Sequence, residues 1–224
     1  MKRFITLALC LFVSVATYAQ TQVIAHRGYH ATKNSYDNTI SSLINAQKLK
    51  VYGSEVDIHE TSDGVLIAIH GMRHRDIKNV QKATFDEIRS LPLENGETVP
   101  TLEEYLIQAK KSKKTKLIIE IKSHPTKEQE ARVVKNAPRG TKIAYLNGDL
   151  TPEQCKKERY TGIDYNLNTL KAHPEWINKC HELGLTVNVW TVNDKKDMQW
   201  FIDMGVDYIT TDKPDVLKRM LKDK

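Results

Sequence analysis

Charged side chains gather at the carboxyl ends of several short apolar runs, where their chemistry can be combined. His26 and Arg27 end one such run in AHRG. Glu55 and Asp57 alternate with apolar residues in EVDIH, and Glu120 does the same in LIIEIK. Acidic side chains on one face of an apolar strand are costly to bury unless they are paired or bind a metal. The spacing therefore indicates a polar site built from strand ends.

These residue types match the needs of a reaction at a phosphate ester. Three carboxylates suit a hard divalent cation such as Ca²⁺ or Mg²⁺. His70 ends the run IAIH, so two imidazoles are available as general acid and base. Arg27 and Lys122 favour an anionic substrate, with phosphate as the first candidate. Taken singly, Lys122 with Glu120 also fits an internal ion pair, and Trp190 in VNVWTVN also fits a core position.

Short apolar runs alternate with helical patterns along most of the chain, which is typical of a parallel α/β sheet. Two capping boxes and three prolines mark helix starts, and a glycine marks a helix end. These are Thr84 with Glu87, Thr101 with Glu104, Pro152, Pro174, Pro214 and Gly184. The expected strands are residues 23–26, 53–59, 65–70, 116–122, 142–146, 162–166, 186–191 and 207–211.

One pair of strands departs from this alternation. Residues 53–59 and 65–70 are joined by a short segment with an Asp-Gly pair, which predicts an antiparallel hairpin. About seven parallel strands then remain. We predict a TIM-type (β/α) barrel of about seven parallel strands with a β-hairpin after the second. An open doubly wound sheet is the alternative, weakened by the absence of a Gly-rich dinucleotide fingerprint.

The N-terminus has the parts of a secretory signal peptide. Lys2 and Arg3 precede an apolar stretch at 4–15, and small residues stand before a cleavage position after Ala19. We expect residues 1–19 to be removed and residues 20–224 to form one domain of a secreted or periplasmic protein. The apolar stretch is too short to span a bilayer comfortably, so no stable membrane insertion is expected.

Composition excludes several classes of protein. Hydrophobic residues at 40% and charged residues at 28% argue against disorder and fibrous repeats. The formal charge of +6 includes one basic cluster at 110–116, KKSKKTK, which we interpret as a solvated helix end, so no nucleic-acid partner is expected. Cys155 and Cys180 would follow the cleavage position, and the sequence leaves open whether they are two thiols or one disulfide.

Several runs, in order along the chain, resemble the glycerophosphodiester phosphodiesterase family. They are AHRG (25–28), DNT (37–39), GSEVDIHETSDGVLIAIH (53–70), VPTLEEYL (99–106), LIIEIK (117–122), VNVWTVN (187–193) and GVDYITTDKP (205–214). The resemblance covers nearly the whole chain after residue 19. It implies a TIM barrel whose small-molecule substrate is a glycerophosphodiester, hydrolysed with a divalent metal to glycerol 3-phosphate and an alcohol.

The resemblance also implies a role for each residue that matches a family motif. The nucleophile would be either a water or the glycerol hydroxyl of the substrate itself. The implied metal ligands are Glu55, Asp57 and Glu120, the acid/base pair is His26 and His70, the phosphate contacts are Arg27 and Lys122, and Trp190 faces the glycerol.

Three features depart from the family pattern. Tyr36-Asp37 precede Asn38 where the family has Pro-Glu, and Gly71 follows His70 where the family has Asp. The interval 123–141 has room for one helix and a turn, whereas the family fits a further strand and helix there. The last two departures motivate one alternative, a catalytically impaired barrel that binds a phosphorylated ligand or an envelope partner. A related phospholipase of the same superfamily is the other alternative.

Overall fold

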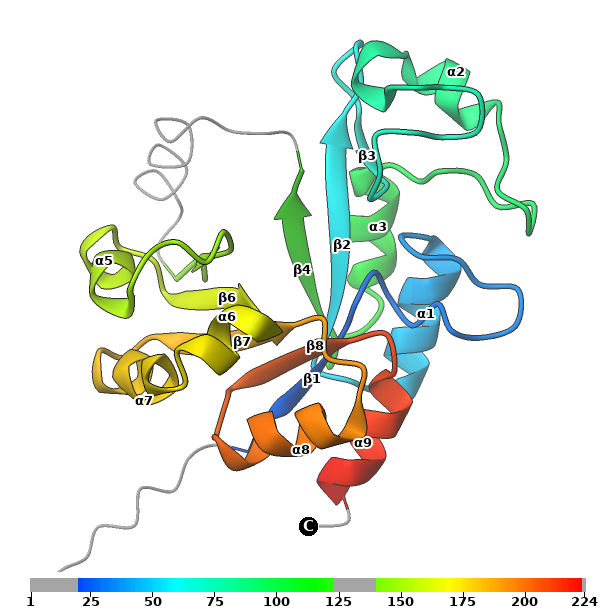
Figure 1. The fold of residues 1–224 in the computed structure, drawn as a ribbon. Helices are drawn as coiled ribbons and strands as arrows, with labels where there is room; N and C mark the ends of the chain where they lie inside the picture. The colour runs from blue at the N-terminus through cyan, green and yellow to red at the C-terminus, as the bar shows by residue number, and fades with distance from the viewer. Residues whose placement is uncertain (1–19, 123–139, 223–224) are drawn as a thin grey trace, which may run out of the picture.

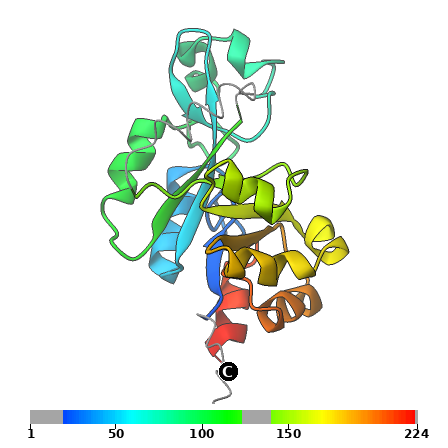
Figure 2. The same ribbon diagram turned by 90° about the vertical axis from the view of Figure 1, so that its left-hand side faces the viewer.

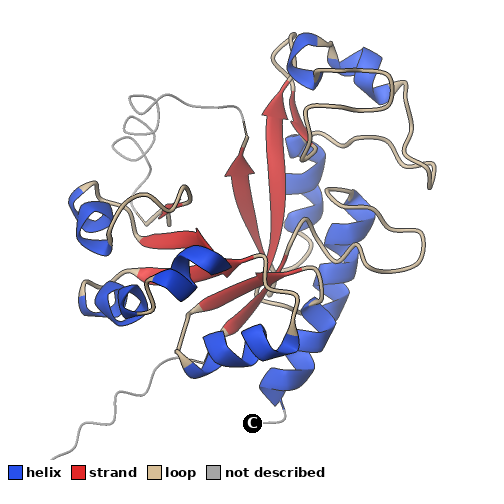
Figure 3. Cartoon of the chain, viewed as in Figure 1, coloured by secondary structure: helices blue, strands red, loops and turns tan. Residues whose placement is uncertain are grey.

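The computed structural model describes residues 20–122 and 140–222. Over these residues the chain forms one curled sheet with helices on its outer face (Figures 1 and 3). Seven parallel strands lie in the order β4-β2-β1-β8-β7-β6-β5, and β3 pairs antiparallel with β2. The strands are β1 (Gln22–Ala25), β2 (Gly53–Glu60), β3 (Leu66–Ala68), β4 (Lys116–Ile121), β5 (Ala144–Tyr145), β6 (Gly162–Asn166), β7 (Thr186–Trp190) and β8 (Tyr208–Thr211).

The predicted TIM-type architecture is confirmed, in the form of a half-barrel. Successive parallel strands are neighbours around the sheet, without the reversal of order that defines a doubly wound sheet. Among the described residues, β4 and β5 form the two ends of the parallel sheet and do not pair with each other. The helix expected within 123–141 and the expected signal peptide lie outside the described residues, except for residues 140 and 141.

The predicted hairpin after the second strand is also confirmed. Ile58 pairs with Ala68 in antiparallel register, and the turn between the strands contains Gly64 at φ +82°. A positive φ of this size is readily available only to glycine. Figure 2 shows the hairpin and the following helix projecting from one end of the molecule.

Local capping explains where most helices begin. The capping boxes at Thr84 and Thr101 are present, and Thr39 and Thr151 form two more. Pro174 is the N-cap rather than the first helical residue of its helix. None of the helices in the described parts of the chain is long and apolar enough to cross a membrane. The helices are α1 (Ile40–Leu49), the 3-10 turn η1 (Val80–Lys82), α2 (Phe85–Arg89), α3 (Leu102–Ala109), α5 (Pro152–Lys157), α6 (Leu167–Ala172), α7 (Glu175–Glu182), α8 (Lys195–Asp203) and α9 (Pro214–Lys222).

The main core lies between the sheet and its outer helices. Val187 and Val189 of β7 are fully buried against side chains such as Phe201 of α8. Because strand residues alternate between faces, the intervening residues line the inside of the curled sheet. Cys155 and Cys180 belong to this core as free thiols, and burial raises the pKa of Cys180 to about 12.

Candidate active site

The turn after β1 holds His26 and Arg27 against the start of α1. Gly28 has φ +82°, and a Cβ atom there would lie 2.3 Å from Oγ of Ser42 and 2.6 Å from its Cβ. Only glycine fits this close approach. Ser42 Oγ donates a hydrogen bond to the Arg27 carbonyl at 3.0 Å, and the Arg27 amide donates to Oε2 of Glu55 at 2.7 Å. The turn is thereby fixed to both a helix and the neighbouring strand.

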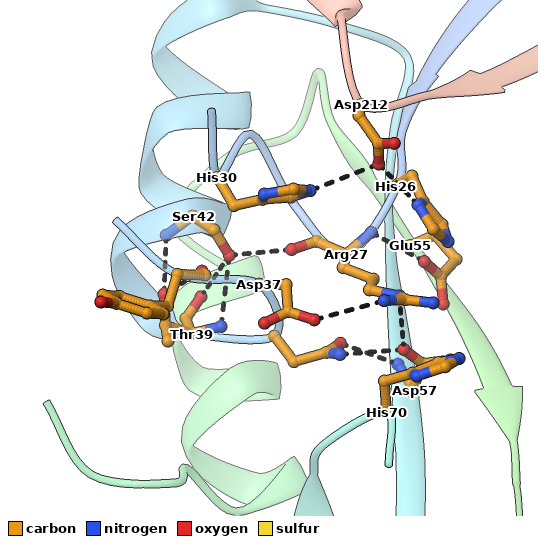
Figure 4. A network of polar contacts seen from close by, with 12 residues as sticks. His26, Arg27, His30, Asp37, Thr39, Ser42, Glu55, Asp57, His70 and Asp212 are labelled. Atoms are coloured by element: carbon orange, nitrogen blue, oxygen red, sulfur yellow. Dashed lines mark hydrogen bonds and ion pairs between the residues drawn. The ribbon is translucent and has the colours of Figure 1, made fainter. Parts of the chain in front are cut away.

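Three predicted carboxylates meet on the inner face of the sheet (Figure 4 shows two of them). Asp57 of β2 and Glu120 of β4 are directly opposite in the parallel register, and Glu55 lies two residues before Asp57. Each residue offers an oxygen within 4.8 Å of the others. Burial, followed by the charge of Asp57, raises the pKa of Glu55 well above its ordinary value.

This cluster fits a divalent cation. Oε1 of Glu55 is buried and has no hydrogen-bond partner in the described part of the chain. An uncompensated buried carboxylate oxygen beside two further carboxylates costs free energy unless a cation or a proton joins it. The donors are all oxygens, which Ca²⁺ and Mg²⁺ prefer.

Two cationic side chains border the carboxylates. Nε of Arg27 lies 3.2 Å from Asp57 Oδ2, and its Nη1 lies 3.4 Å from Asp37. Nζ of Lys122 lies 2.6 Å from Glu120 and 3.3 Å from Asp57. Although burial opposes its charge, these ion pairs raise the pKa of Lys122. Both side chains remain partly exposed, so an anionic group can reach them.

His26 is held by a carboxylate from the far end of the chain. Its Nδ1 lies 2.7 Å from Oδ1 of Asp212, which is also 3.3 Å from Nε2 of His30 (Figure 4). Asn193 donates to Asp212 Oδ2 at 2.6 Å and accepts from its amide at 2.9 Å. Burial opposes ionisation, but hydrogen bonds from His26, His30 and Asn193 hold the pKa of Asp212 well below its ordinary value. Since an ionised carboxylate only accepts, His26 donates from Nδ1, and its Nε2 is left for a substrate.

His70 is held through its backbone. Its carbonyl oxygen lies 3.2 Å from Nε2 of His59, whose Nδ1 is 3.3 Å from the Gln81 amide nitrogen. Among the described residues, none forms a hydrogen bond with the His70 ring, which lies beside Asp57 in Figure 4. Burial lowers the pKa of His70. The two histidines are therefore positioned by different means.

The wall formed by β6 and β7 has its own polar network. Trp190 donates from its indole nitrogen to the Asp164 carbonyl at 2.9 Å, and Asn188 donates to Oδ1 of Asp164 at 2.8 Å. Burial raises the pKa of Asp164 to about 7. Trp190 has no hydrogen bond or ion pair with the other predicted site residues, so its contact with glycerol stays a prediction.

The structure brings most of the predicted residues to one edge and adds others that sequence reasoning missed. Asn38 donates to Asp57 Oδ2 at 2.8 Å and accepts from the Asp57 amide at 3.0 Å. Asn38 and Asp212 stand inside two of the runs that resemble the family, DNT and GVDYITTDKP, but the sequence pattern alone gives neither residue a role. The predicted residues that lie together are His26, Arg27, Glu55, Asp57, His70, Glu120 and Lys122.

Comparisons with known proteins match both the sequence and the fold. A model of the Glycerophosphoryl diester phosphodiesterase family matches residues 26–147 and 144–216. A glycerophosphodiester phosphodiesterase of Caldanaerobacter subterraneus is 30% identical over 91% of this chain and 98% of the relative.

Solved structures extend the similarity. A glycerophosphodiester phosphodiesterase from Parabacteroides distasonis is 41% identical, with a TM-score of 0.86 over 91% of this chain and 98% of that one. A phosphodiesterase from Oleispira antarctica, solved with its product sn-glycerol-3-phosphate, is 18% identical and has a TM-score of 0.70 over 92% and 98% of the two chains.

Proposed function

This chain belongs to the glycerophosphoryl diester phosphodiesterase family, and from that premise we propose that two histidines and a divalent cation hydrolyse glycerophosphodiesters in its half-barrel. Its enzyme class is phosphoric diester hydrolase. The products would be glycerol 3-phosphate and an alcohol. The observation that carries the proposal is the meeting of three carboxylates, two histidines and two cationic side chains at one edge of the sheet.

Glu55, Asp57 and Glu120 would hold the cation, as Ca²⁺ or Mg²⁺. When bound, it would polarise the phosphoryl oxygens and offset the negative charge that develops on them. Asn38 keeps Asp57 in place through its two hydrogen bonds, and the Arg27 amide does the same for Glu55.

Arg27 and Lys122 would bind the phosphate oxygens. Their ion pairs with Asp57 and Glu120 already orient both basic side chains toward the centre of the site. Charged donors that need no rearrangement during the reaction stabilise its transition state most effectively. These two residues would therefore position the diester as well as attract it.

The histidines would move the protons. One would take the proton of the attacking hydroxyl, which belongs to a water or to the glycerol moiety, as its oxygen bonds to phosphorus. The other would donate a proton to the leaving oxygen as its P–O bond breaks and the alcohol departs. Attack by a water would give glycerol 3-phosphate directly. Attack by the glycerol hydroxyl would give a cyclic phosphate, which a water would then open to glycerol 3-phosphate, with the histidines moving the protons in the reverse direction. Nε2 is the atom of His26 available for this transfer, because Asp212 holds Nδ1.

A catalytically impaired, ligand-binding barrel is the second candidate. It is favoured by Gly71 in place of the family's Asp and, among the described residues, by the lack of pairing between β4 and β5. The Parabacteroides distasonis structure, matched over 98% of its own length, supports the view that this shorter barrel is a regular form of the family. We therefore place the enzyme first.

We also propose export of the mature domain, because residues 1–19 have the pattern of a signal peptide. A phospholipase acting on intact lipid ranks below the diesterase. Equal or faster turnover of phospholipid vesicles than of glycerophosphocholine would reverse that order.

The direct test is release of glycerol 3-phosphate from glycerophosphocholine by protein beginning at Gln20. We expect EDTA to abolish release and added Ca²⁺ or Mg²⁺ to restore it and to raise the Tm. Glu55→Gln should remove both metal effects, whereas Glu153→Gln, an exposed control, should retain them. Chelator-resistant turnover would refute the metal role. A folded protein with a metal-dependent Tm but no turnover would favour the binding barrel.

A further inference from the structure

The lysine run at 110–116 has no part in the proposed reaction and lies at the opposite edge of the barrel from the active site. It follows the last residue of α3 and leads into the first residue of β4. His26 and Lys122, by contrast, follow the last residues of their strands. Because the strands are parallel, these two sets of residues occupy opposite ends of the sheet. A partner bound to the lysines would leave the active site open.

Hydrogen bonds connect the last turn of α3 and this loop to the end of α1. Gln108 donates to Oε1 of Gln47 at 2.8 Å, and Gln47 donates to the Gln108 carbonyl at 3.1 Å. Thr115 Oγ1 donates to the Val51 carbonyl at 3.0 Å. Figures 1 and 2 both show the loop after α3 beside the end of α1. The lysines of the two segments therefore belong to one surface.

This surface, the basic edge, is positively charged throughout. In the sequence, neither 41–54 nor 105–119 contains an aspartate or glutamate. In the part of the chain that the structure describes, none of its lysines forms an ion pair. Its members are Lys48, Lys50, Lys110, Lys111, Lys113, Lys114 and Lys116, and all of them are exposed.

Two large aliphatic side chains are exposed next to these lysines. Leu106 is 40% and Ile107 53% exposed in the last turns of α3, whose buried side carries Tyr105 and Gln108. The amide of Lys110 donates to the Leu106 carbonyl, so the helix leads directly into the lysines. Aliphatic side chains beside a row of lysines are typical of segments that lie on a membrane surface.

We propose that the basic edge docks peripherally on an anionic phospholipid bilayer. The lysines contact the lipid headgroups, while Leu106 and Ile107 enter the interfacial layer. A nucleic acid is the less suitable anion, because single strands are bound through stacking on accessible aromatic rings. Tyr52, the aromatic residue beside Val51, is stacked on Tyr208 with ring centroids 4.9 Å apart. Docking of this kind is surface attachment, distinct from the membrane insertion that the sequence argues against.

The test is co-sedimentation of protein beginning at Gln20 with phosphatidylcholine vesicles, with and without phosphatidylglycerol. Binding should require phosphatidylglycerol and should weaken as salt screens the charges. Reversing four charges of the basic edge should reduce the bound-to-free ratio roughly tenfold or more. The Ile107→Ser variant should also bind less, without loss of the salt dependence. The four changes are Lys110→Glu, Lys111→Glu, Lys113→Glu and Lys114→Glu.

A matched control carries the same change of charge at four exposed lysines elsewhere: Lys156→Glu, Lys157→Glu, Lys195→Glu and Lys196→Glu. It should bind vesicles as the unmodified protein does. Equal loss in the control, binding independent of phosphatidylglycerol, or binding to an oligonucleotide without binding to vesicles would each overturn the proposal. Turnover of glycerophosphocholine is measured on every variant and should be unchanged, so failure of docking is distinguished from failure of the proposed reaction.

Discussion

The two histidines of the site lie in regions that support them very differently. His26 follows β1, inside the continuous part of the sheet, and its ring is fixed by Asp212 and, through it, by Asn193. His70 follows the short strand β3 of the projecting hairpin, and the contact from His59 reaches only its carbonyl oxygen. The His26 ring is oriented by a hydrogen bond to its own Nδ1, whereas the His70 ring is positioned only through its backbone.

This difference shows that two histidines with the same implied role need not have their rings held equally firmly. Asp212, which holds His26, follows β8, and β8 pairs with β1 over four residues. The support of His70 comes from its own hairpin, and Gly71 contributes no side chain. We therefore expect the orientation of the His26 ring to depend on residues distant in the sequence. We expect the His70 ring to become better oriented when a side chain is added beside it.

The largest expected effect tests whether both histidines take part in chemistry at all. His26→Asn and His70→Asn should each lower kcat by about 10²- to 10⁴-fold, the usual contribution of a general acid or base. Steady-state turnover of glycerophosphocholine measures this, with His173→Asn on the exposed surface as the control. A wild-type kcat in the His70→Asn variant would show that His70 is neither the general acid nor the general base.

The next effect separates the two kinds of support. Asp212→Asn should lower kcat by about 10²-fold with little change in KM, because an amide no longer selects the Nδ1–H form of His26. The corresponding change on the hairpin side, His59→Gln, should cost less than about tenfold, since it acts through the backbone. A larger loss for His59→Gln than for Asp212→Asn would contradict the comparison.

Restoring a carboxylate beside His70 should shift the pH profile. Among the described residues, a Cβ atom at Gly71 would meet only Arg73 backbone atoms, at 3.8 and 3.9 Å, so a side chain can begin there in Gly71→Asp. A nearby carboxylate favours the imidazolium, so the pKa of His70 should rise and, if His70 acts as the base, the acid limb of kcat/KM should move to higher pH by about 0.5–1 unit. Gly71→Asn is the uncharged control and should leave the limb in place.

The smallest effect concerns a residue outside both regions. In the folded protein the pKa of Asp164 is raised to about 7, so its carboxyl group stays protonated between about pH 4 and 7. In the unfolded chain the same carboxyl group is ionised over that range. Stability from this group therefore falls as pH rises through that range. Asp164→Asn should raise the free energy of unfolding by about 1–2 kcal/mol at pH 8 and leave it unchanged near pH 4, by urea denaturation. An equal gain at both pH values would contradict this explanation.

Much of the architecture could be predicted because its signals are local. Asp63-Gly64 between two apolar runs specified the hairpin, and the capping boxes at Thr84 and Thr101 specified helix starts. The alternation of Glu55 and Asp57 placed both carboxylates on one face of a strand. Asp212 was missed as a partner of His26 because 186 residues separate them, and only the pairing of β8 with β1 brings them together.

The sequence by itself determined which residues carry charge and on which face of a strand each one lies, because a strand alternates with a period of two. Tertiary structure alone decided which of those faces meet. The parallel register places Asp57 opposite Glu120, and Asn38 is brought to Asp57 by the turn that leads into α1. Register and loop paths depend on contacts between distant segments, which no local pattern records.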